Sequence, residues 1–391
     1  MICIVEHFRI QRILLFAIGV WPYNQSKCVQ FQYLLLSVVL NSFVIFQLTP
    51  FINSELTVDL IIKLLSTIFF SLLCLIHQVS FWINIDVVKG FVERLQDVCN
   101  DLKDEKEIAI IKKYANSAEY ISILVILLAV CCAFIITLMP IYPRILSTVL
   151  LVNISRPLYN MQFVTEYFID KEKNFYLILL HTYAFLYIAI IVLVGGGLMG
   201  CAYLKHVCGL FSIASYRIEQ SMIANIHEKT DQWNKMKKKI RLAVDAHRTA
   251  IELSEFFMSS FNETYFCLMV VAVLCLCLNL YKVCQTVLRD KVEEFLLHLI
   301  LAISMLVYSF LANSCGEEIT EHYNNMFSSA YSIEWYRAPI RVQKLILFLL
   351  QRSCKMHGIK IGGLFTASLE GFASLSTASV SYFTVIYSMQ N

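Results

Sequence analysis

Seven long apolar segments determine what this chain can fold into. They cover residues 31–50, 60–83, 118–141, 175–204, 257–281, 293–313 and 364–388. Each is close to the ~20 residues with which an α-helix crosses the hydrocarbon core of a bilayer. Only 16% of all residues are charged, against about 25% in a soluble protein. The sequence therefore predicts an all-α membrane protein with seven transmembrane helices.

The basic residues predict the direction of these spans. Of the 32 Lys and Arg residues, 24 fall in the N-terminal segment and in the loops after the second, fourth and sixth spans, and 7 fall on the opposite side. Loops rich in Lys and Arg stay in the cytoplasm. We therefore expect a cytoplasmic N-terminus and an extracellular C-terminus, the inverse of a G-protein-coupled receptor.

This pattern divides the chain into four regions. They are a cytosolic N-terminal interfacial segment (1–30), six transmembrane helices (31–313), a cytosolic anchor segment (314–363), and the seventh helix with a short extracellular tail (364–391). Apolar residues keep helical spacing through 203–257, which predicts that spans four and five continue as helices below the membrane. The many apolar side chains of 320–360 need a partner at that depth, either these extensions or a second subunit.

Polar side chains in the seventh segment lie in one line. Their spacing alternates between four and three residues, which traces a single stripe along a helix: Glu370, Ser374, Thr377, Ser381, Thr384 and Ser388. A hydroxyl stripe on an otherwise apolar helix indicates a surface that meets water inside a membrane. Helix packing is the alternative, because Ser and Thr let transmembrane helices approach closely.

Other small and polar residues inside the spans indicate packing. The three consecutive glycines that begin at Gly195 predict either a close helix contact or a bend. Asp59 and Lys63 are four residues apart and predict a local ion pair. Three isolated histidines are expected to be hydrogen-bonded interior residues: His77, His181 and His298.

No arrangement of residues indicates an enzyme. The sequence has no nucleophile beside a base, no paired catalytic carboxylates and no phosphate-binding loop. Its 14 cysteines are scattered, without the spacing of a metal site or of an extracellular disulfide framework. The net charge of +3 gives no indication of nucleic-acid binding. We therefore expect no catalytic residue, metal or cofactor, and no nucleic-acid partner.

The two ends of the chain carry motifs of a known family. Near the N-terminus, Gly19-Val20-Trp21-Pro22 is similar to the Gly-x-Trp-Pro of insect odorant receptors. The C-terminal signature of that family resembles a set of residues in this chain: Trp335-Tyr336 with Arg337 and Arg341, Gly363, Ser368-Leu369-Glu370-Gly371-Phe372 and Ser381-Tyr382-Phe383. Length, span number and inverted orientation agree along the whole chain. The related gustatory receptors typically have Thr-Tyr at the last of these motifs, so Ser-Tyr-Phe favours the odorant branch.

The resemblance implies an odorant-gated, nonselective cation channel in the plasma membrane of olfactory sensory neurons. This family forms heterotetramers of a tuning subunit with a shared olfactory co-receptor. This chain resembles a tuning subunit, because it lacks the enlarged cytosolic loop of the co-receptor. The expected partners are therefore the co-receptor, a small volatile odorant, permeating cations and membrane lipid.

The resemblance also assigns roles to residues. The seventh helix lines the family's pore, so the stripe from Glu370 to Ser388 would line it here, and Val385 takes the position of the hydrophobic gate. An apolar ring closes a pore by dewetting. The cytosolic helices join the subunits, which implies an assembly role for Trp335 and Tyr336. The sequon at Asn153 falls in the expected outer loop and is a glycosylation candidate.

The family's ligand pocket lies among spans two, three, four and six. A volatile ligand requires an apolar, aromatic cavity with a few polar groups. The candidate residues are Thr67, Phe69, Phe70, Phe134, Thr137, Met139, Tyr176, Tyr183, Tyr187, Ser304 and Met305. For each of them, an ordinary interior position is the alternative.

Two other functions stay open at this point. A gustatory-type receptor of the same fold would form a channel without the co-receptor. A metabotropic seven-helix receptor is the more distant alternative, since the positive-inside rule predicts the opposite orientation.

Overall fold

The structure, a computed structural model, describes residues 4–53, 55–141, 162–171, 173–222, 229–289, 291–354 and 358–390. These residues are almost entirely helical. The helices are α1 (Ile4–His7), α2 (Arg9–Ala17), α3 (Lys27–Leu48), α4 (Pro50–Asn53), α5 (Val58–Ile83), α6 (Ile85–Asn100), α7 (Glu105–Leu138), α9 (Phe175–Met222), α10 (Lys229–Leu288), α11 (Val292–Ser332), η1 (Trp335–Arg337), α12 (Ile340–Ser353) and α13 (Leu369–Gln390). Two short strands, β1 (Lys360–Ile361) and β2 (Phe365–Thr366), pair in antiparallel register, with Lys360 opposite Thr366.

Side-chain caps fix where three of the long helices begin. Ser26 accepts a backbone N–H at 3.3 Å before α3, Thr57 does so at 3.3 Å before α5, and Asp104 at 3.0 Å before α7. Amides in the first turn of a helix have no partner inside the helix. The capping oxygens supply one, so each helix begins directly after its polar residue.

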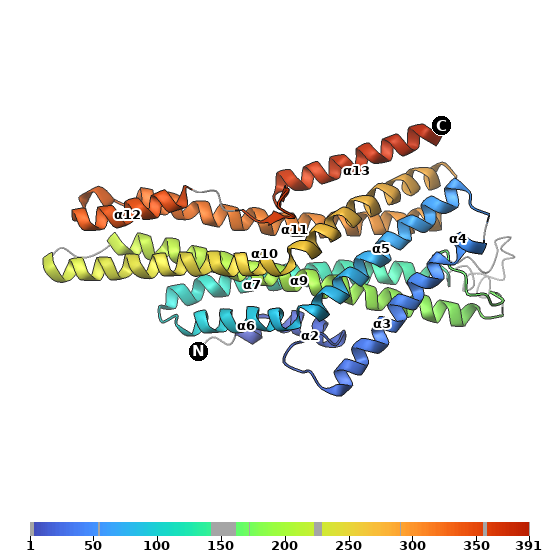
Figure 1. Cartoon of the computed structure of the whole chain (residues 1–391), viewed down its shortest axis with the longest axis horizontal. Helices are drawn as coiled ribbons and strands as arrows, with labels where there is room; N and C mark the ends of the chain where they lie inside the picture. The colour runs from blue at the N-terminus through green and yellow to red at the C-terminus, as the bar shows by residue number, and fades with distance from the viewer. Residues whose placement is uncertain are drawn as a thin grey trace.

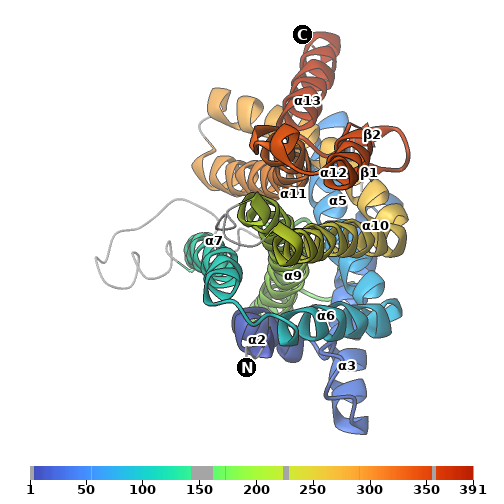
Figure 2. The same ribbon diagram turned by 90° about the vertical axis from the view of Figure 1, so that its left-hand side faces the viewer.

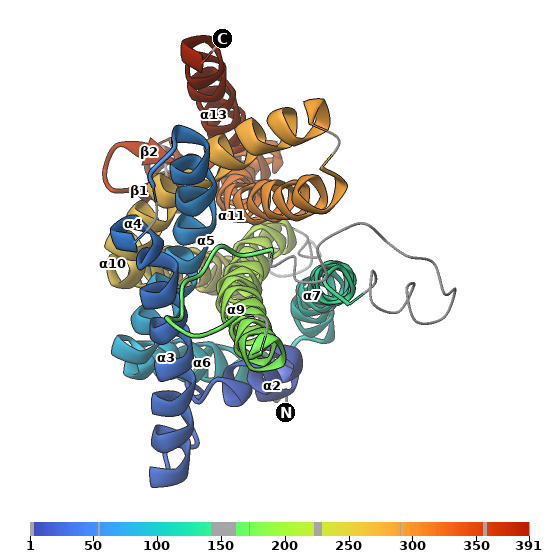
Figure 3. The same ribbon diagram turned by 90° about the vertical axis from the view of Figure 1, so that its right-hand side faces the viewer.

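Helix α9 is the central element of the bundle. It contacts α2, α3, α5, α7, α10 and α11, and the two end-on views show it surrounded by other helices (Figures 2 and 3). The main hydrophobic core follows its length. Helix α9 runs through its three glycines without a break, and a Cβ at Gly196 would lie only 2.7 Å from His77 Nδ1 of α5. The glycines therefore mark a close helix contact and not a bend.

Six helices among the described residues are long and apolar enough to cross a membrane. They are α3 together with α4, then α5, α7, α9, α10 and α11, and they coincide with the first six predicted spans. Helix α13 has 22 residues but is not among these six, because hydroxyl groups reduce its hydropathy. The predicted helical membrane fold is confirmed for these six spans, and the seventh predicted span corresponds to the less apolar α13.

Helices α9, α10 and α11 are much longer than a bilayer crossing needs, with 48, 60 and 41 residues. Their far ends pack with α12 around a second hydrophobic core, which contains Ile218, Ile240, Met326, Val342 and Ile346. Figure 1 shows this part, with α12, at one end of the long axis. The predicted continuation of spans four and five as helices is confirmed.

The last helix begins later than the sequence predicts. The apolar segment was expected to become helical at residue 364, but β1, β2 and their turn occupy this stretch, and α13 begins at Leu369. Gly362 and Gly363 have φ angles of +62° and +70°. Glycine adopts this left-handed region freely, so the chain turns here. Helix α13 then runs along the outside of the bundle, in contact with α10 and α11 (Figure 1).

Candidate functional site

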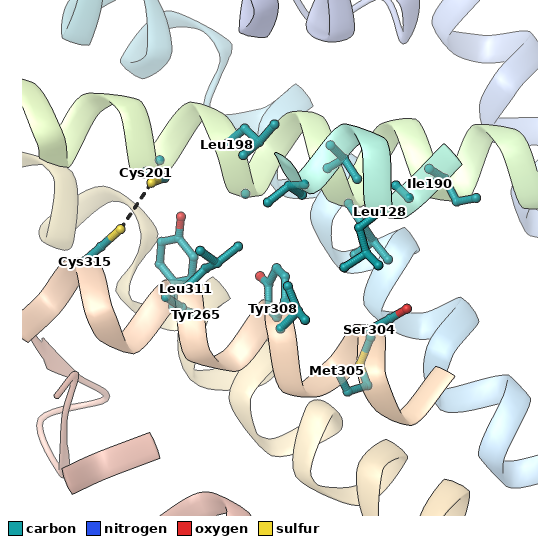
Figure 4. A pocket seen from close by; sticks show the side chains of 18 of the residues that line it. Leu128, Ile190, Leu198, Cys201, Tyr265, Ser304, Met305, Tyr308, Leu311 and Cys315 are labelled. Carbon is teal, nitrogen blue, oxygen red and sulfur yellow. Dashed lines mark hydrogen bonds between the residues drawn. The ribbon is translucent and has the colours of Figure 1, made fainter. Parts of the chain in front are cut away.

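A cavity of about 170 Å³ lies inside the bundle. Its wall combines residues of α5, α7, α9, α10 and α11 with residues around the β1–β2 hairpin. Most wall residues are aliphatic, among them Leu128, Ile190, Leu198, Met305 and Leu311 (Figure 4). An apolar cavity of about 150 Å³ is large enough to hold benzene. The cavity therefore fits a small, uncharged, largely apolar molecule.

Hydroxyl groups of three residues reach the cavity wall. Ser304 on α11 donates to the carbonyl one turn back at 2.7 Å. The Tyr308 hydroxyl is hydrogen-bonded to His77 Nε2 at 2.6 Å. Tyr265 of α10 places its hydroxyl against α9, where a Cβ at Gly200 would lie 2.9 Å from the oxygen. These hydroxyls give the cavity a few polar contacts in an apolar wall.

The structure places three of the predicted pocket residues in this wall: Phe70, Ser304 and Met305. Other candidates lie outside it. Thr67 is buried, but its hydroxyl donates to the Leu64 carbonyl at 3.0 Å. Phe69 and Met139 pack elsewhere in the main core. The predicted sixth span therefore contributes both of its candidate residues to the cavity, and the second span contributes one of three.

The candidates on α7 and on the first half of α9 form a separate cluster. The Tyr183 hydroxyl donates to the Thr137 carbonyl at 2.6 Å, and the Tyr187 hydroxyl lies 3.0 Å from Thr137 Oγ1. These bonds join α7 to α9 away from the cavity. Phe134 and Tyr176 point outward, with 62% and 73% of their surface exposed.

Helix α10 and the hairpin also contribute to the wall, although none of the predicted pocket residues lies on them. Tyr265 comes from α10, and Ile359, Ile361 and Ala367 come from the hairpin region. Tyrosines inside apolar spans, such as Tyr265 and Tyr308, were the available signal. The hairpin residues had none, because Ile359 and Ile361 were expected in the cytosolic anchor segment and Ala367 in the seventh span.

The polar stripe of α13 faces away from the rest of the chain. All six of its residues are exposed, and Val385 beside them is 55% exposed. The opposite face of the helix packs on the bundle, where Ser379 is fully buried and Phe383 and Ile386 join Leu278 of α10 in a small apolar cluster. The hydroxyls of the stripe therefore do not serve packing within this chain.

Charged residues join the helices beside the end of α13. Asp59 of α5 pairs with Lys282 at 2.7 Å and with Arg289 at 3.0 Å, and Lys63 pairs with Glu294 of α11 at 2.9 Å. The predicted local pair between Asp59 and Lys63 is wrong, because each of them finds a partner on another helix. These pairs connect α5 to α10, to the chain just beyond it and to α11.

The three isolated histidines are hydrogen-bonded, as predicted. Their partners are Tyr308 for His77 at 2.6 Å, Ser42 and Tyr167 for His181 at 3.0 and 2.8 Å, and Asn279 for His298 at 2.9 Å. Each bond crosses between two segments of the chain. These histidines therefore connect elements of the bundle.

The predicted assembly residues lie in η1, between α11 and α12. Trp335 packs partly on the second core, while Tyr336 is 60% exposed. Asn153, the glycosylation candidate, lies outside the described residues.

The arrangement defines a multi-pass helical membrane protein with a small apolar cavity in its bundle. The model of the family described as 7tm Odorant receptor matches residues 57–380. This chain belongs to that family, whose members are receptors and not enzymes.

Individual relatives agree with this assignment. Odorant receptor 22c of Drosophila melanogaster is 22% identical over 187 residues, which are 46% of this chain and 45% of that protein. The odorant receptor coreceptor of Aedes aegypti is 25% identical over 155 residues, 39% of this chain and 31% of that protein. The chain thus spans less than half the length of these curated relatives. The matches fit a tuning receptor better than a co-receptor.

A solved structure covers nearly the whole chain. The insect olfactory receptor OR5 from Machilis hrabei, in complex with eugenol, superposes with a TM-score of 0.80 at 16% identity, over 99% of this chain and 98% of that one. A second structure of the same receptor gives a TM-score of 0.79. At this identity, the likeness shows a shared fold.

Proposed function

We propose that this chain is the tuning subunit of an odorant-gated, nonselective cation channel. It forms a heterotetramer with the olfactory co-receptor in the plasma membrane of olfactory sensory neurons, with its N-terminus in the cytoplasm. Membership of the odorant receptor family supports the role as a receptor, and the apolar cavity supports a small volatile ligand. The observation that carries the proposal is the hydroxyl stripe of α13, which faces away from the chain's own core.

The proposed position and lining of the pore follow from this stripe of α13. Seventh helices from four subunits, each with its packed face on its own bundle, present their hydroxyls to a common axis. Ser374, Thr377 and Ser381 then contact water and ions, and Glu370 at the end of the stripe attracts cations. Hydroxyls that are not arranged as a rigid cage do not separate Na⁺ from K⁺ sharply. The ring of Val385 closes the path by dewetting.

The hairpin is the element that connects ligand to pore. Ile361 and Ala367 line the cavity, and α13 begins two residues after Ala367. The hairpin packs tightly on α11, since a Cβ at Gly316 would lie 2.4 Å from the Ala367 carbonyl oxygen. A ligand that fills the cavity therefore presses on a segment with little free space around it. The start of α13 moves in response, and this movement wets the Val385 constriction.

Exposed apolar side chains support assembly at the far end of the molecule. Ile340, Leu347 and Phe348 on α12, with Tyr336 before it, are each at least 60% exposed. Apolar groups at such a water-facing depth are stabilised when a neighbouring subunit covers them. This surface is the proposed contact with the co-receptor.

Whole-cell current tests the proposal. Cells that express this chain with and without an insect olfactory co-receptor are exposed to a broad panel of volatiles. We expect a cation current that requires the co-receptor and persists when G-protein signalling is blocked. A current from this chain alone would instead support the self-sufficient gustatory type, and loss of the current under the block would support a metabotropic receptor.

A further inference from the structure

Two cysteines meet at one end of the cavity. Cys201 of α9 and Cys315 of α11 have their sulfur atoms 3.3 Å apart, with Cys315 Sγ donating to Cys201 Sγ (Figure 4). Both residues belong to the cavity wall, and both are free thiols. Cys132 of α7 also lines the cavity, but among the described residues no second sulfur is hydrogen-bonded to it. The cavity thus combines an apolar volume with one pair of adjacent thiols.

The surrounding structure holds the two sulfurs together. Lys205 lies one turn beyond Cys201 on α9, and Glu318 lies one turn beyond Cys315 on α11. Their side chains form an ion pair of 2.6 Å, with only 12% and 22% of each exposed. This contact fixes the separation of α9 and α11 beside the thiols, so their approach is a stable feature of the packing.

A hydroxyl group also lies beside the pair. The Tyr265 ring stands close to both cysteines in Figure 4, and its oxygen lies against Gly200, the residue before Cys201. A buried hydroxyl at this position can donate to a carbonyl oxygen of a molecule in the cavity. The end of the cavity therefore offers a sulfur nucleophile and a hydrogen-bond donor within one small volume.

We propose that the Cys201–Cys315 pair is a covalent modification site for small α,β-unsaturated carbonyl compounds that enter the cavity. A thiol is a soft nucleophile that reacts through its thiolate. Donation by Cys315 stabilises negative charge on Cys201, because hydrogen bonds to a charged acceptor are stronger than neutral ones. Cys201 is therefore the attacking sulfur, and Cys315 is its positioning residue.

The addition needs no other reactant. A bond forms between Cys201 Sγ and the β-carbon while the π bond of the alkene breaks, and the electron pair moves to the carbonyl oxygen as an enolate, next to Tyr265. The proton lost by the Cys201 thiol then returns to the α-carbon. The product is a thioether with a saturated carbonyl group, and nothing is oxidised, reduced or released.

The position of the adduct predicts its effect. It occupies the cavity near Ile361 and Ala367, which precede α13. A bound electrophile therefore holds the hairpin displaced after free ligand has been washed away. Formation of the adduct requires only the cavity and the thiols. The lasting current rests, in addition, on the proposed channel function.

Peptide mapping by mass spectrometry tests the adduct directly. The purified full-length chain is incubated with (E)-2-hexenal, with hexanal as the matched control that differs only in the alkene. We expect a mass increase on Cys201 with the first aldehyde and none with the second. Excess hexanal should slow this labelling but leave labelling of the exposed Cys354 unchanged, since it competes for the cavity only. Cys315→Ala, which has no donor at this position, should slow labelling of Cys201 about fivefold, the value of one hydrogen bond.

Three results would overturn the proposal. They are labelling of Cys354 or Cys132 with none on the pair, labelling of the pair that excess hexanal does not slow, and an unchanged rate in Cys315→Ala. Thermal stability of each variant shows whether it is folded. In co-receptor-expressing cells, current evoked by (E)-2-hexenal should outlast washout in the natural chain and become reversible in Cys201→Ser. An adduct without current would leave the site intact and count against the channel function alone.

Discussion

Replacing Gly196 by alanine tests how closely α9 and α5 pack. A Cβ at this position would lie 2.7 Å from His77 Nδ1 and 2.9 Å from Phe81 Cε2, whereas ordinary contacts begin at 3.4 Å. The two rings must therefore move by roughly 0.5 to 0.7 Å in a close-packed interior. Both are buried, and His77 is held by its 2.6 Å bond to Tyr308. The rings have little room to yield.

The size of the effect follows from three contributions. Overpacking a core costs about 1–3 kcal/mol, and lengthening the His77–Tyr308 bond adds up to about 1 kcal/mol. Alanine gains about 1 kcal/mol over glycine inside a helix. Gly196→Ala should therefore destabilise the protein by up to about 3 kcal/mol. Gly197→Ala is the matched control, because the nearest atom to its Cβ would be Tyr308 Cε2 at 3.6 Å.

Thermal unfolding of the detergent-solubilised chain, followed by size-exclusion chromatography of a fluorescent fusion, measures both variants. We expect Gly196→Ala to unfold below the natural chain and Gly197→Ala to unfold at or above it. The two substitutions make the same chemical change at adjacent helical positions, so helix propensity cancels between them. If Gly196→Ala were as stable as Gly197→Ala, the close contact between α9 and α5 would be refuted.

Three further substitutions test the remaining features. Asp59→Asn leaves Lys282, whose side chain is 2% exposed, without its carboxylate partner. The variant should be less stable by about 2–3 kcal/mol, which is less than for a fully buried pair because Asp59 is partly exposed; an unchanged Tm would contradict this. Val385→Ser should raise the ligand-free current of the assembled channel, while Val380→Ser, exposed on the same helix, should not, and equal currents would remove the gate role. Tyr308→Phe should lower stability by about 1–2 kcal/mol, and it should weaken dose responses to carbonyl volatiles more than dose responses to hydrocarbons. Equal shifts of the two dose responses would exclude contact between this hydroxyl and the ligand.

Elements with a strong repeating pattern were predictable from the sequence. The apolar spans and the long continuations of α9 and α10 follow from length and from helical spacing, which depend on nearby residues only. The isolated histidines followed from the cost of leaving a polar group unpaired inside a bundle. In each case one segment of sequence contains the whole signal.

Features that depend on contacts between distant segments were not predictable. Asp59 and Lys63 have the spacing of a local pair, but in the folded chain Asp59 pairs with Lys282 and Lys63 pairs with Glu294, both on other helices. Phe134 lies on a helix that is apolar all round, so its sequence does not tell which side faces the cavity. The second half of the hairpin was predicted to be the start of the last helix, because its apolar residues continue directly into the apolar segment of that helix.

The orientation of α13 required the whole chain. Both faces of α13 are compatible with a membrane. A small hydroxyl residue can pack against another helix, as Ser379 does here, or it can contact water. The folded structure distinguishes the two faces, because the apolar cluster around Phe383 and Ile386 covers only one of them. The other face then presents a regular row of hydroxyls, with nothing from the described part of the chain against it. Hydroxyl groups in such a row find few hydrogen-bond partners in lipid and more in water. A hydrated axis shared with the same helix of neighbouring subunits would satisfy it, and this is the physical reason why we propose α13 as the pore helix.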